Sequence, residues 1–239
     1  MKITLPDESI KELPIGTTGL DVALSIGPGL AKSAVAVNID GVQKDLCDPI
    51  DCDCSLSIIT LDSEEGLEIM RHTVAAQVLA LAIKNIYPDA KLAIGPTIEN
   101  GFYYDFLTQK TISTEDLPKI EDEMRKIIQE KSTIKKSLHD KNNAIGFFEN
   151  RSEDYKIKII EESEQSDHFQ IYSNEDADFI DLCRGPHLPD LTHIGAFKLT
   201  KVSGAYWKGD SSNEMLTRIY GTAWRNKKEL DAYLTQLEE

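Results

Sequence analysis

Residues 181–187, which read DLCRGPH, place a carboxylate, a thiol, a guanidinium and an imidazole within one heptapeptide. The Gly-Pro pair in front of His187 predicts a turn, because proline fixes its own φ angle and glycine tolerates angles that other residues avoid. Such a turn can bring Cys183 and His187 toward one point. This Cys-x-x-x-His spacing suits metal ligation or thiol and imidazole chemistry, but it fits a surface turn with a half-buried cysteine equally well.

Two further side chains extend this chemical set. His72 lies in a helical pattern and Lys156 in a short segment predicted as a strand, and each alone is more often a structural residue. Together with Asp181, Cys183 and His187 they supply two imidazoles, a thiol, a cation and a carboxylate. This set suits hydrolysis of an ester: the cation stabilises an oxyanion, an imidazole positions or deprotonates water, and the carboxylate orients a neighbour. No glycine-rich phosphate loop of the Walker or dinucleotide type occurs in the sequence.

The composition predicts a soluble globular protein with a sizeable core. The chain has 239 residues, 41% of them hydrophobic and 28% charged, which suffices for one large domain or two ordinary ones. Its four cysteines are too few for a disulfide framework. No apolar run approaches the roughly 20 residues of a membrane span, and no signal peptide is recognisable. We therefore expect a cytoplasmic protein with no membrane partner.

The formal net charge of −15 bears on nucleic-acid binding. An acidic surface repels nucleic acid, so such a partner would need local basic patches; scattered solvated lysines are the alternative. Candidates for such patches are Lys131, Lys135, Lys136, Lys156, Lys158, Lys198, Lys201, Lys208 and Arg218.

The first sixty residues predict a small α+β unit of their own. Alternating strands, a helix capped by Thr17 or Thr18 and a hairpin turn at Asp40-Gly41 follow one another in the order of a ubiquitin-like β-grasp. The predicted elements are a hairpin of residues 2–5 and 10–13, a helix over 20–26 that ends at the Gly-Pro-Gly of 27–29, strands over 34–39 and 42–46, and a last strand over 56–59.

A second unit is predicted to begin with a helix that starts at Asp62, carries a buried stripe and runs to about residue 87. A second amphipathic helix is predicted over 113–131. From residue 156 onward the alternation favours an antiparallel sheet. A final helix over 226–239 has no capping glycine or proline, and we expect it to continue. The predicted strands of this unit are 91–94, 156–160, 169–172, 179–182, 197–202, 205–207 and 215–220.

Several long stretches match a known family. They are ITLPD (3–7), SIGPGLAKSAVA (25–36), EEGLEIMRHT (64–73), AIGPTIENGFYYDF (93–106), DLCRGPH (181–187), FKLTKVSGAYWKGD (197–210) and MLTRIYGTAW (215–224). By these motifs the chain resembles the N-terminal part of bacterial threonyl-tRNA synthetases over essentially all of its 239 residues.

The resemblance implies an α+β protein in three parts. A TGS domain of β-grasp type (1–61) would precede an editing domain with an antiparallel sheet (62–224), whose fold is shared with the second additional domain of alanyl-tRNA synthetases, and a linker helix would start at 225–239. The implied activity is hydrolysis of serine mischarged onto threonine tRNA. Such a second site is needed because a binding pocket rejects an amino acid lacking one methyl group by only about 1–3 kcal/mol.

The family's functional residues can be carried over onto this sequence. The resemblance implies that a lysine and histidines position the ester and the attacking water. It also implies that the terminal adenosine with its seryl group lies near Gly95 and Tyr104. The implied catalytic residues are His72, Lys156, Asp181, Cys183 and His187, and the implied substrate-binding residues are Gly95, Tyr104 and Gln77.

The resemblance also implies partners. The substrate would be the acceptor end of tRNA(Thr) carrying serine. The family's class II core, with its ATP, magnesium and zinc, does not occur in this sequence, so this polypeptide is expected not to charge tRNA. Homodimer formation is expected only with that core.

The sequence departs from the family on the first long helix. The family carries His-x-x-x-His there, but in this chain the residue four after His72 is Ala76. Alignment from the C-terminal part of the helix instead places Gln77 at the position of the second histidine, with one residue inserted before it. Positions five apart on an ideal helix point roughly 140° away from each other, and they converge only if a π-bulge absorbs the insertion. Because glutamine cannot take up a proton near neutral pH, the chain is either an active esterase or a tRNA-binding or regulatory module that has lost hydrolysis.

The same residues raise the question of a metal. His72, Cys183 and His187 offer an open three-ligand zinc site, as in the alanyl relatives, which bind zinc. Because threonyl editing domains resemble a water-based site instead, we expect no cofactor for this chain. A zinc-binding structural protein is a third alternative.

Overall fold

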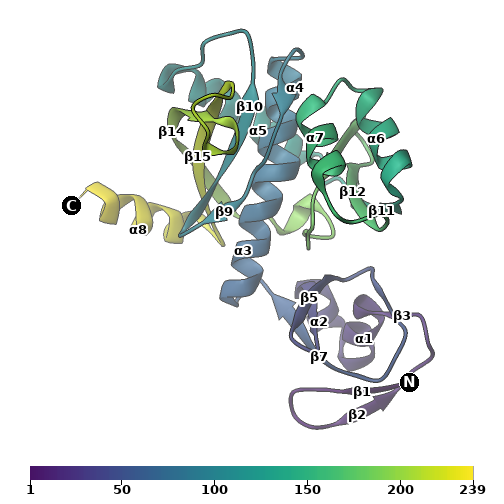
Figure 1. Cartoon of the computed structure of the whole chain (residues 1–239). Helices are drawn as coiled ribbons and strands as arrows, with labels where there is room; N and C mark the ends of the chain where they lie inside the picture. The colour runs from purple at the N-terminus through teal and green to yellow at the C-terminus, as the bar shows by residue number, and fades with distance from the viewer. Residues whose placement is uncertain (239) are drawn as a thin grey trace.

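In the computed structural model of the chain, which describes residues 1–238, a small N-terminal unit lies against one end of a long helix that runs through a larger unit (Figure 1). The long helix has a five-stranded sheet on one side and two short helices with a three-stranded sheet on the other (Figure 1). This arrangement confirms the predicted α+β class.

The N-terminal unit is a β-grasp, as predicted. Its sheet has the strand order β2-β1-β7-β4-β5, and the first and last strands of the unit, β1 and β7, pair in parallel. The hairpin turn at Asp40-Gly41 has positive φ angles of 49° and 85°, as a two-residue turn of this kind requires. The strands are β1 (Lys2–Thr4), β2 (Ile10–Glu12), β3 (Thr17–Thr18), β4 (Ala34–Ile39), β5 (Val42–Asp45), β6 (Pro49–Ile50) and β7 (Cys54–Thr60).

Two helices accompany this sheet. Thr18 caps α1 (Gly19–Ile26) by accepting a hydrogen bond from the Asp21 N–H, while the Asp21 carboxylate accepts one from the Thr18 N–H in return. Helix α1 ends at Ile26 with Gly27 as its C-cap, as predicted, and a second helix that was not predicted, α2 (Pro28–Ser33), follows directly. Proline fits the first turn of a helix, where its missing N–H is not needed.

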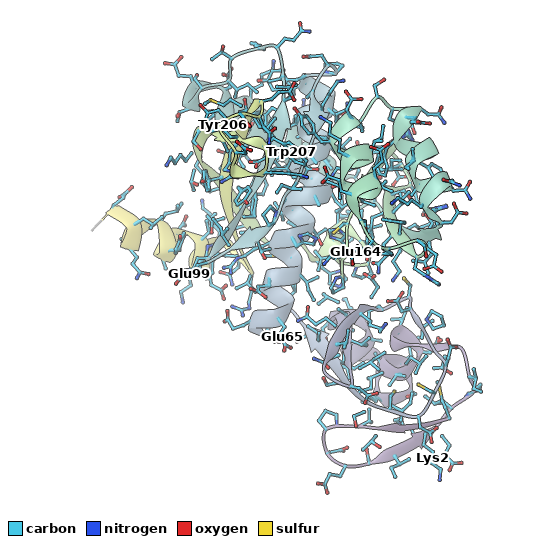
Figure 2. The ribbon with its side chains drawn as sticks, in the orientation of Figure 1. Lys2, Glu65, Glu99, Glu164, Tyr206 and Trp207 are labelled. Carbon is cyan, nitrogen blue, oxygen red and sulfur yellow. The ribbon has the colours of Figure 1, made fainter. Side chains whose placement is uncertain are left out.

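The long helix of the larger unit has three parts: α3 (Glu64–Thr73), a π-helical segment η1 (Val74–Leu79) and α4 (Ala80–Ile86). Its N-cap is Ser63, one residue after the predicted start at Asp62, because the Ser63 hydroxyl accepts the hydrogen bond from Gly66 N–H at 3.1 Å. Glu65 marks this end of the helix in Figure 2. The π-helical turn that absorption of the inserted residue would require is present within the helix that carries His72.

This helix also qualifies an expectation about membranes. By length and composition alone, the 23 residues Glu64–Ile86 are sufficient to cross a membrane, contrary to what the sequence led us to expect. The most apolar part of the segment is 89% buried inside the molecule, and the core helix of a soluble protein meets the same criterion.

The five-stranded sheet has the order β14-β15-β10-β8, with β9 paired to β10. The segments 197–202 and 205–206, predicted as parts of two strands, form the single strand β14 with an irregularity at Leu199/Lys201, and Trp207, predicted as the end of the second strand, instead begins η4. Helix α5 is amphipathic as predicted and buries Ile120, Met124 and Ile127. The bounds are β8 (Lys91–Leu92), β9 (Thr97–Ile98), β10 (Gly101–Leu107), η2 (Thr114–Asp116), α5 (Leu117–Gln129), η3 (Leu191–His193), β14 (Ala196–Tyr206), η4 (Trp207–Gly209), β15 (Met215–Trp224) and α8 (Lys227–Glu238).

The prediction for residues 156–160 is wrong. This segment is part of a helix, α7, that buries Lys156 and Ile160 four residues apart on one face. Alternation over only five residues fits a helix as well as a strand, so the pattern could not decide. Neither β11 nor α6 was predicted. The elements here are β11 (Ile134–His139), α6 (Lys141–Glu149), α7 (Asp154–Glu162), β12 (Phe169–Asn174) and β13 (Phe179–Leu182), and the three strands pair antiparallel in this order.

Candidate functional site

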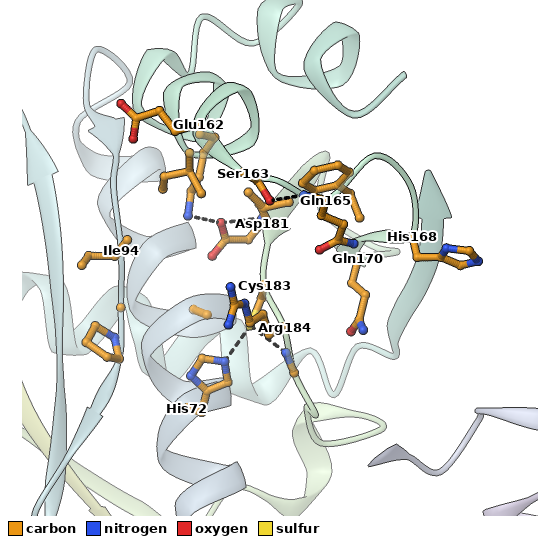
Figure 3. Close-up of a pocket in the computed structure, with 18 residues that line it drawn as sticks. His72, Ile94, Glu162, Ser163, Gln165, His168, Gln170, Asp181, Cys183 and Arg184 are labelled. Atoms are coloured by element: carbon orange, nitrogen blue, oxygen red, sulfur yellow. Dashed lines mark hydrogen bonds and ion pairs between the residues drawn. The ribbon is translucent and has the colours of Figure 1, made fainter. Parts of the chain in front are cut away.

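A cavity of about 1010 Å³ opens between the long helix, the loop before β9, helix α7 and the 183–187 turn that follows β13 (Figure 3). Five predicted site residues line it, and they come from segments far apart in the sequence. These residues are His72, Gly95, Lys156, Asp181 and Cys183.

A buried ion pair forms one wall of the cavity. The Lys156 Nζ lies 2.6 Å from Asp181 Oδ1, and the two residues are only 3% and 1% exposed. The hydroxyl of Tyr104 donates to Asp181 Oδ2 at 3.2 Å, and the Leu182 N–H donates to Oδ1 at 2.8 Å. Burial raises the pKa of Asp181, and the nearby Lys156 charge opposes this shift. The pair thus presents a fixed ammonium group to whatever enters the cavity.

Opposite this pair, the 183–187 turn and the long helix form a cluster of His72, Cys183 and His187. The His72 Nε2 lies 2.6 Å from Cys183 Sγ, and the imidazoles of His72 and His187 stack with centroids 4.6 Å apart. The predicted turn is present, with Gly185 at a φ of 65° and its N–H donating to Cys183 Sγ at 3.2 Å. Cys183 and His187 do converge, as the spacing predicted.

Burial sets the protonation of this cluster. It lowers the pKa of His72 to about 4, with a further lowering by the Lys156 charge, and it lowers the pKa of His187 well below its usual value. It also raises the pKa of the Cys183 thiol to about 12. Near neutral pH both imidazoles are therefore uncharged and the thiol keeps its proton, which it can donate to His72. Cys183 in this state is not a thiolate nucleophile.

Thr73 fixes the tautomer of His187. The Thr73 hydroxyl donates its only proton to the Ile69 carbonyl at 2.9 Å and accepts from Leu188 N–H at 3.0 Å. The His187 Nδ1 lies 3.0 Å from the same oxygen, and it must therefore be the donor there. Its Nε2 then carries a lone pair, and this buried atom has no hydrogen-bond partner among the described residues. Sequence reasoning missed Thr73, although it directly follows His72.

Two residues predicted to bind substrate do not line the cavity. Gln77 is fully buried in the π-helical segment with neither amide atom hydrogen-bonded to any described residue, and Ala76 faces the cavity in its place. The π-turn is thus present, but it does not direct Gln77 toward His72. Tyr104 is also fully buried, behind Gly95 and Asp181, and it supports the site from behind. His187 is likewise enclosed, at 2% exposure.

The rim of the cavity adds polar residues that the sequence did not single out for this role. Arg184 is exposed on the 183–187 turn, and Gln165, His168 and Gln170 lie across from it (Figure 3). Arg184 could have been found, because it lies inside the DLCRGPH motif. Gln165 and His168 follow α7, which sequence reasoning took for a strand, and Gln170 lies on β12, which was predicted as a strand but not as part of the site.

The cluster of His72, Cys183 and His187 is also chemically suited to a metal ion. One ligand atom from each lies within 4.8 Å of the others, and the unpartnered Nε2 of His187 has the lone pair that a metal requires. These three residues would hold the ion, with Thr73 orienting His187 from outside. A zinc ion bound there would supply Lewis-acid chemistry at an open fourth position.

We expect the chelator-treated protein to lose stability as the pH falls below neutral. The pKa of His72 is about 4 in the folded chain and 6.5 in the unfolded chain, so its contribution is complete above pH 6.5 and is lost progressively toward pH 4. The full effect is on the order of 3 kcal/mol, and His187 acts in the same direction. Urea unfolding at pH 7 and pH 4 measures most of it.

The matched pair His72→Gln and His168→Gln controls this experiment. The first removes the half-buried imidazole of His72 and should weaken the pH dependence, of which His187 supplies the remainder, whereas His168 is exposed and its replacement should leave the dependence unchanged. Equal slopes in all three proteins would contradict the assignment.

Comparisons with known proteins agree with the fold. The family described as the TGS domain matches residues 1–60, and the family described as the threonyl and alanyl tRNA synthetase second additional domain matches residues 170–220. The second match covers β13, the 183–187 turn, β14 and part of β15. The chain therefore contains a TGS domain and, over residues 170–220, resembles the editing-type second additional domain of threonyl and alanyl tRNA synthetases.

Similar proteins narrow this class. The chain is 52% identical to the threonine–tRNA ligase of Paramagnetospirillum magneticum, 49% to that of Hahella chejuensis and 48% to that of Acetivibrio thermocellus, over 99%, 99% and 100% of its own length. It spans 37% of the length of each of these relatives. The chain matches the N-terminal region of threonyl-tRNA synthetases, as the sequence motifs indicated. The predicted domain limits at 61/62 and 224/225 stay predictions.

Proposed function

We propose that this chain hydrolyses the ester of Ser-tRNA(Thr). The observation that carries the proposal is the buried Lys156–Asp181 pair on the wall of a cavity that also holds an uncharged His72. The cavity of about 1010 Å³ lies at the upper end of the usual range for ligand pockets, about 300–1,000 Å³, and would accept a terminal adenosine with its amino acid.

In the proposed reaction, water attacks the ester carbonyl carbon and the bond between this carbon and the ribose oxygen breaks, releasing serine and a free tRNA hydroxyl. The ammonium group of Lys156 stabilises the negative charge that develops on the carbonyl oxygen. Asp181 holds this ammonium in place, and the fully buried Tyr104 supports Asp181 from behind. Uncharged His72, with a pKa near 4, orients the water by accepting a hydrogen bond from it at Nε2 once the Cys183 thiol, which otherwise donates to this atom, turns away.

The partner and setting follow from this activity. We propose the acceptor end of tRNA(Thr) as the partner, with Arg184 at the cavity rim available to a phosphate or hydroxyl of the terminal nucleotides. We propose a cytoplasmic location and no membrane partner. A homodimer is proposed to require the aminoacylation core known from the family. We further propose that hydrolysis needs no cofactor, because Lys156 already supplies a positive charge at the cavity wall.

One observation favours a second function. The cavity wall has Ala76 where the family pattern has an imidazole, and Gln77 is buried away from it. The chain could therefore bind the acceptor end without hydrolysing it, as an editing-defective binding or regulatory module.

Deacylation assays with Ser-tRNA(Thr) and Thr-tRNA(Thr) test these alternatives. We expect the unaltered protein to hydrolyse the seryl ester selectively, at a rate that a metal chelator does not change. The matched variant is Ala76→His, which restores an imidazole at a position that lines the cavity without deleting a residue.

These assays distinguish the hydrolase from the binding module and from a metal-dependent site. Hydrolysis by Ala76→His alone would overturn the proposal in favour of the binding module. Loss of hydrolysis on chelation, with recovery on adding zinc, would overturn the proposed absence of a cofactor and point to the His72, Cys183 and His187 cluster as the metal site.

A further inference from the structure

We propose that Asp45 of the TGS domain is a positioning residue for the editing site, so that the TGS domain helps to hold the 183–187 turn in its working geometry. The positioning role rests on observed contacts, and only the expected effect of Asp45 on the deacylation rate rests on the proposed function. The contacts that carry it lie between the two domains, where β5 approaches the larger unit (Figure 1).

Asp45 is a buried carboxylate whose oxygens are divided between different partners of the editing domain. It is 6% exposed at the end of β5. Its Oδ1 accepts from the backbone N–H of His187 at 2.9 Å, and its Oδ2 accepts from the Tyr172 hydroxyl at 2.6 Å. Lys136 lies 3.0 Å from Oδ2 and also pairs with Asp48. A carboxylate removed from water in this way is costly unless charged and polar groups satisfy it, as they do in this case.

Both hydrogen bonds of Asp45 hold groups that belong to or contact the cluster of His72, Cys183 and His187. The first holds the backbone of His187 itself. The second fixes the Tyr172 ring, which stands edge-on to the His187 imidazole with centroids 4.5 Å apart. A Cβ on Gly185 would lie 2.9 Å from Tyr172 Cζ, so the turn follows the surface of this ring closely. His187 is thus held by Asp45 at its main chain, by Tyr172 at its edge and by Thr73 at Nδ1.

A shift of the 183–187 turn would displace side chains that line the cavity. Cys183 Sγ meets His72 Nε2 at 2.6 Å only because the turn folds back against the long helix, and His187 stacks on His72 for the same reason. Editing depends on the orientation of His72 in the proposed mechanism, and misplacement of a catalytic group by about 1 Å can cost about 100-fold in rate. Asp45 therefore acts through His187 and Cys183, with no contact to substrate.

The variant Asp45→Asn tests this in the full chain. An amide keeps the shape but has one acceptor oxygen, so it can serve either the His187 N–H or the Tyr172 hydroxyl and must turn its donor toward the other. The control is Asp21→Asn, which weakens the cap of α1 within the same TGS domain and touches nothing in the editing domain. Two readouts are used: the imidazole nitrogen signals of His72 and His187 by NMR, and single-turnover deacylation of Ser-tRNA(Thr) beside its binding affinity.

We expect Asp45→Asn to shift the ring signals of His187 and His72 and to lower the deacylation rate about 10-fold or more with tRNA affinity unchanged. Asp21→Asn should change neither, even if it lowers the melting temperature. Ring signals and a rate that match the unaltered protein would overturn the proposal.

The NMR readout stands apart from catalysis. If the unaltered protein does not deacylate, the proposed function fails, and the ring signals alone still decide whether Asp45 positions the cluster. If Asp45→Asn does not fold, Tyr172→Phe provides the same test, because it removes one of the two hydrogen bonds and keeps the ring. Unchanged histidine signals in that variant would count against the proposal.

Discussion

Replacing Lys156 with methionine is expected to lower the rate of Ser-tRNA(Thr) deacylation by about 100- to 1,000-fold, the usual cost of removing one group that stabilises an oxyanion. Methionine keeps most of the length of the lysine side chain but has no charge. Loss of the Lys156 ammonium also leaves Asp181 as an unpaired carboxylate at 1% exposure, which is expected to destabilise the fold by about 3–5 kcal/mol. Single-turnover kinetics and urea unfolding measure the two effects.

Two variants separate these effects. Lys158→Met removes an exposed ammonium two residues along the same helix and should leave both rate and stability nearly unchanged. The double variant Lys156→Met with Asp181→Asn removes both charges, and it should recover much of the stability but none of the activity. A Lys156→Met protein that hydrolyses within threefold of the unaltered chain would contradict the assigned role.

Lys156 also shows what local pattern can and cannot reveal. The sequence identified it as a site residue, yet placed it on a strand, because the five residues 156–160 alternate in a way that two structures satisfy. The decision came from tertiary packing. Tyr155, next to Lys156, packs on Trp207 with centroids 4.8 Å apart, and this contact between residues distant in sequence is invisible to periodicity.

Elements with strong local chemistry were predicted well. Thr18 and Asp21 form a capping box that fixes the start of α1, and Asp40-Gly41 fixes a hairpin through its positive φ angles. The Gly-Pro pair likewise predicted the turn that brings Cys183 to His187. In each case the determining atoms lie within a few residues of one another, so the sequence contains the whole interaction.

The direction in which a side chain points was harder to predict from the sequence. An insertion in the long helix raised a π-bulge as one way to absorb it, and a π-turn is present, but the direction of Gln77 depends on how that turn packs against its neighbours. The structure turns Ala76 toward the cavity and buries Gln77. Asp45 was overlooked for a related reason: 142 residues separate it from His187, and nothing near it in sequence shows that it meets the site.

The close approach of Gly95 to Tyr104 leads to the second large effect. In Gly95→Ala, the new Cβ would lie 2.6 Å from Tyr104 Cε2 and closer still to Cδ2. Because this ring is fully buried, it cannot swing aside into solvent. Overpacking of this kind is expected to cost about 1–3 kcal/mol in the free energy of unfolding. Gly146→Ala, whose Cβ meets nothing within 4 Å on helix α6, should instead stabilise the protein slightly.

The loss of activity in Gly95→Ala should exceed what its stability explains, because both possible relaxations disturb the site. Moving Tyr104 pulls its hydroxyl from Asp181, which holds Lys156, and moving the loop disturbs the backbone of Gly95, with which His72 forms a hydrogen bond. We therefore expect kcat to fall about 10-fold or more while KM changes little. A raised KM with kcat intact would mean that the methyl group only narrows the cavity, and that Tyr104 does not support the Lys156–Asp181 pair in catalysis.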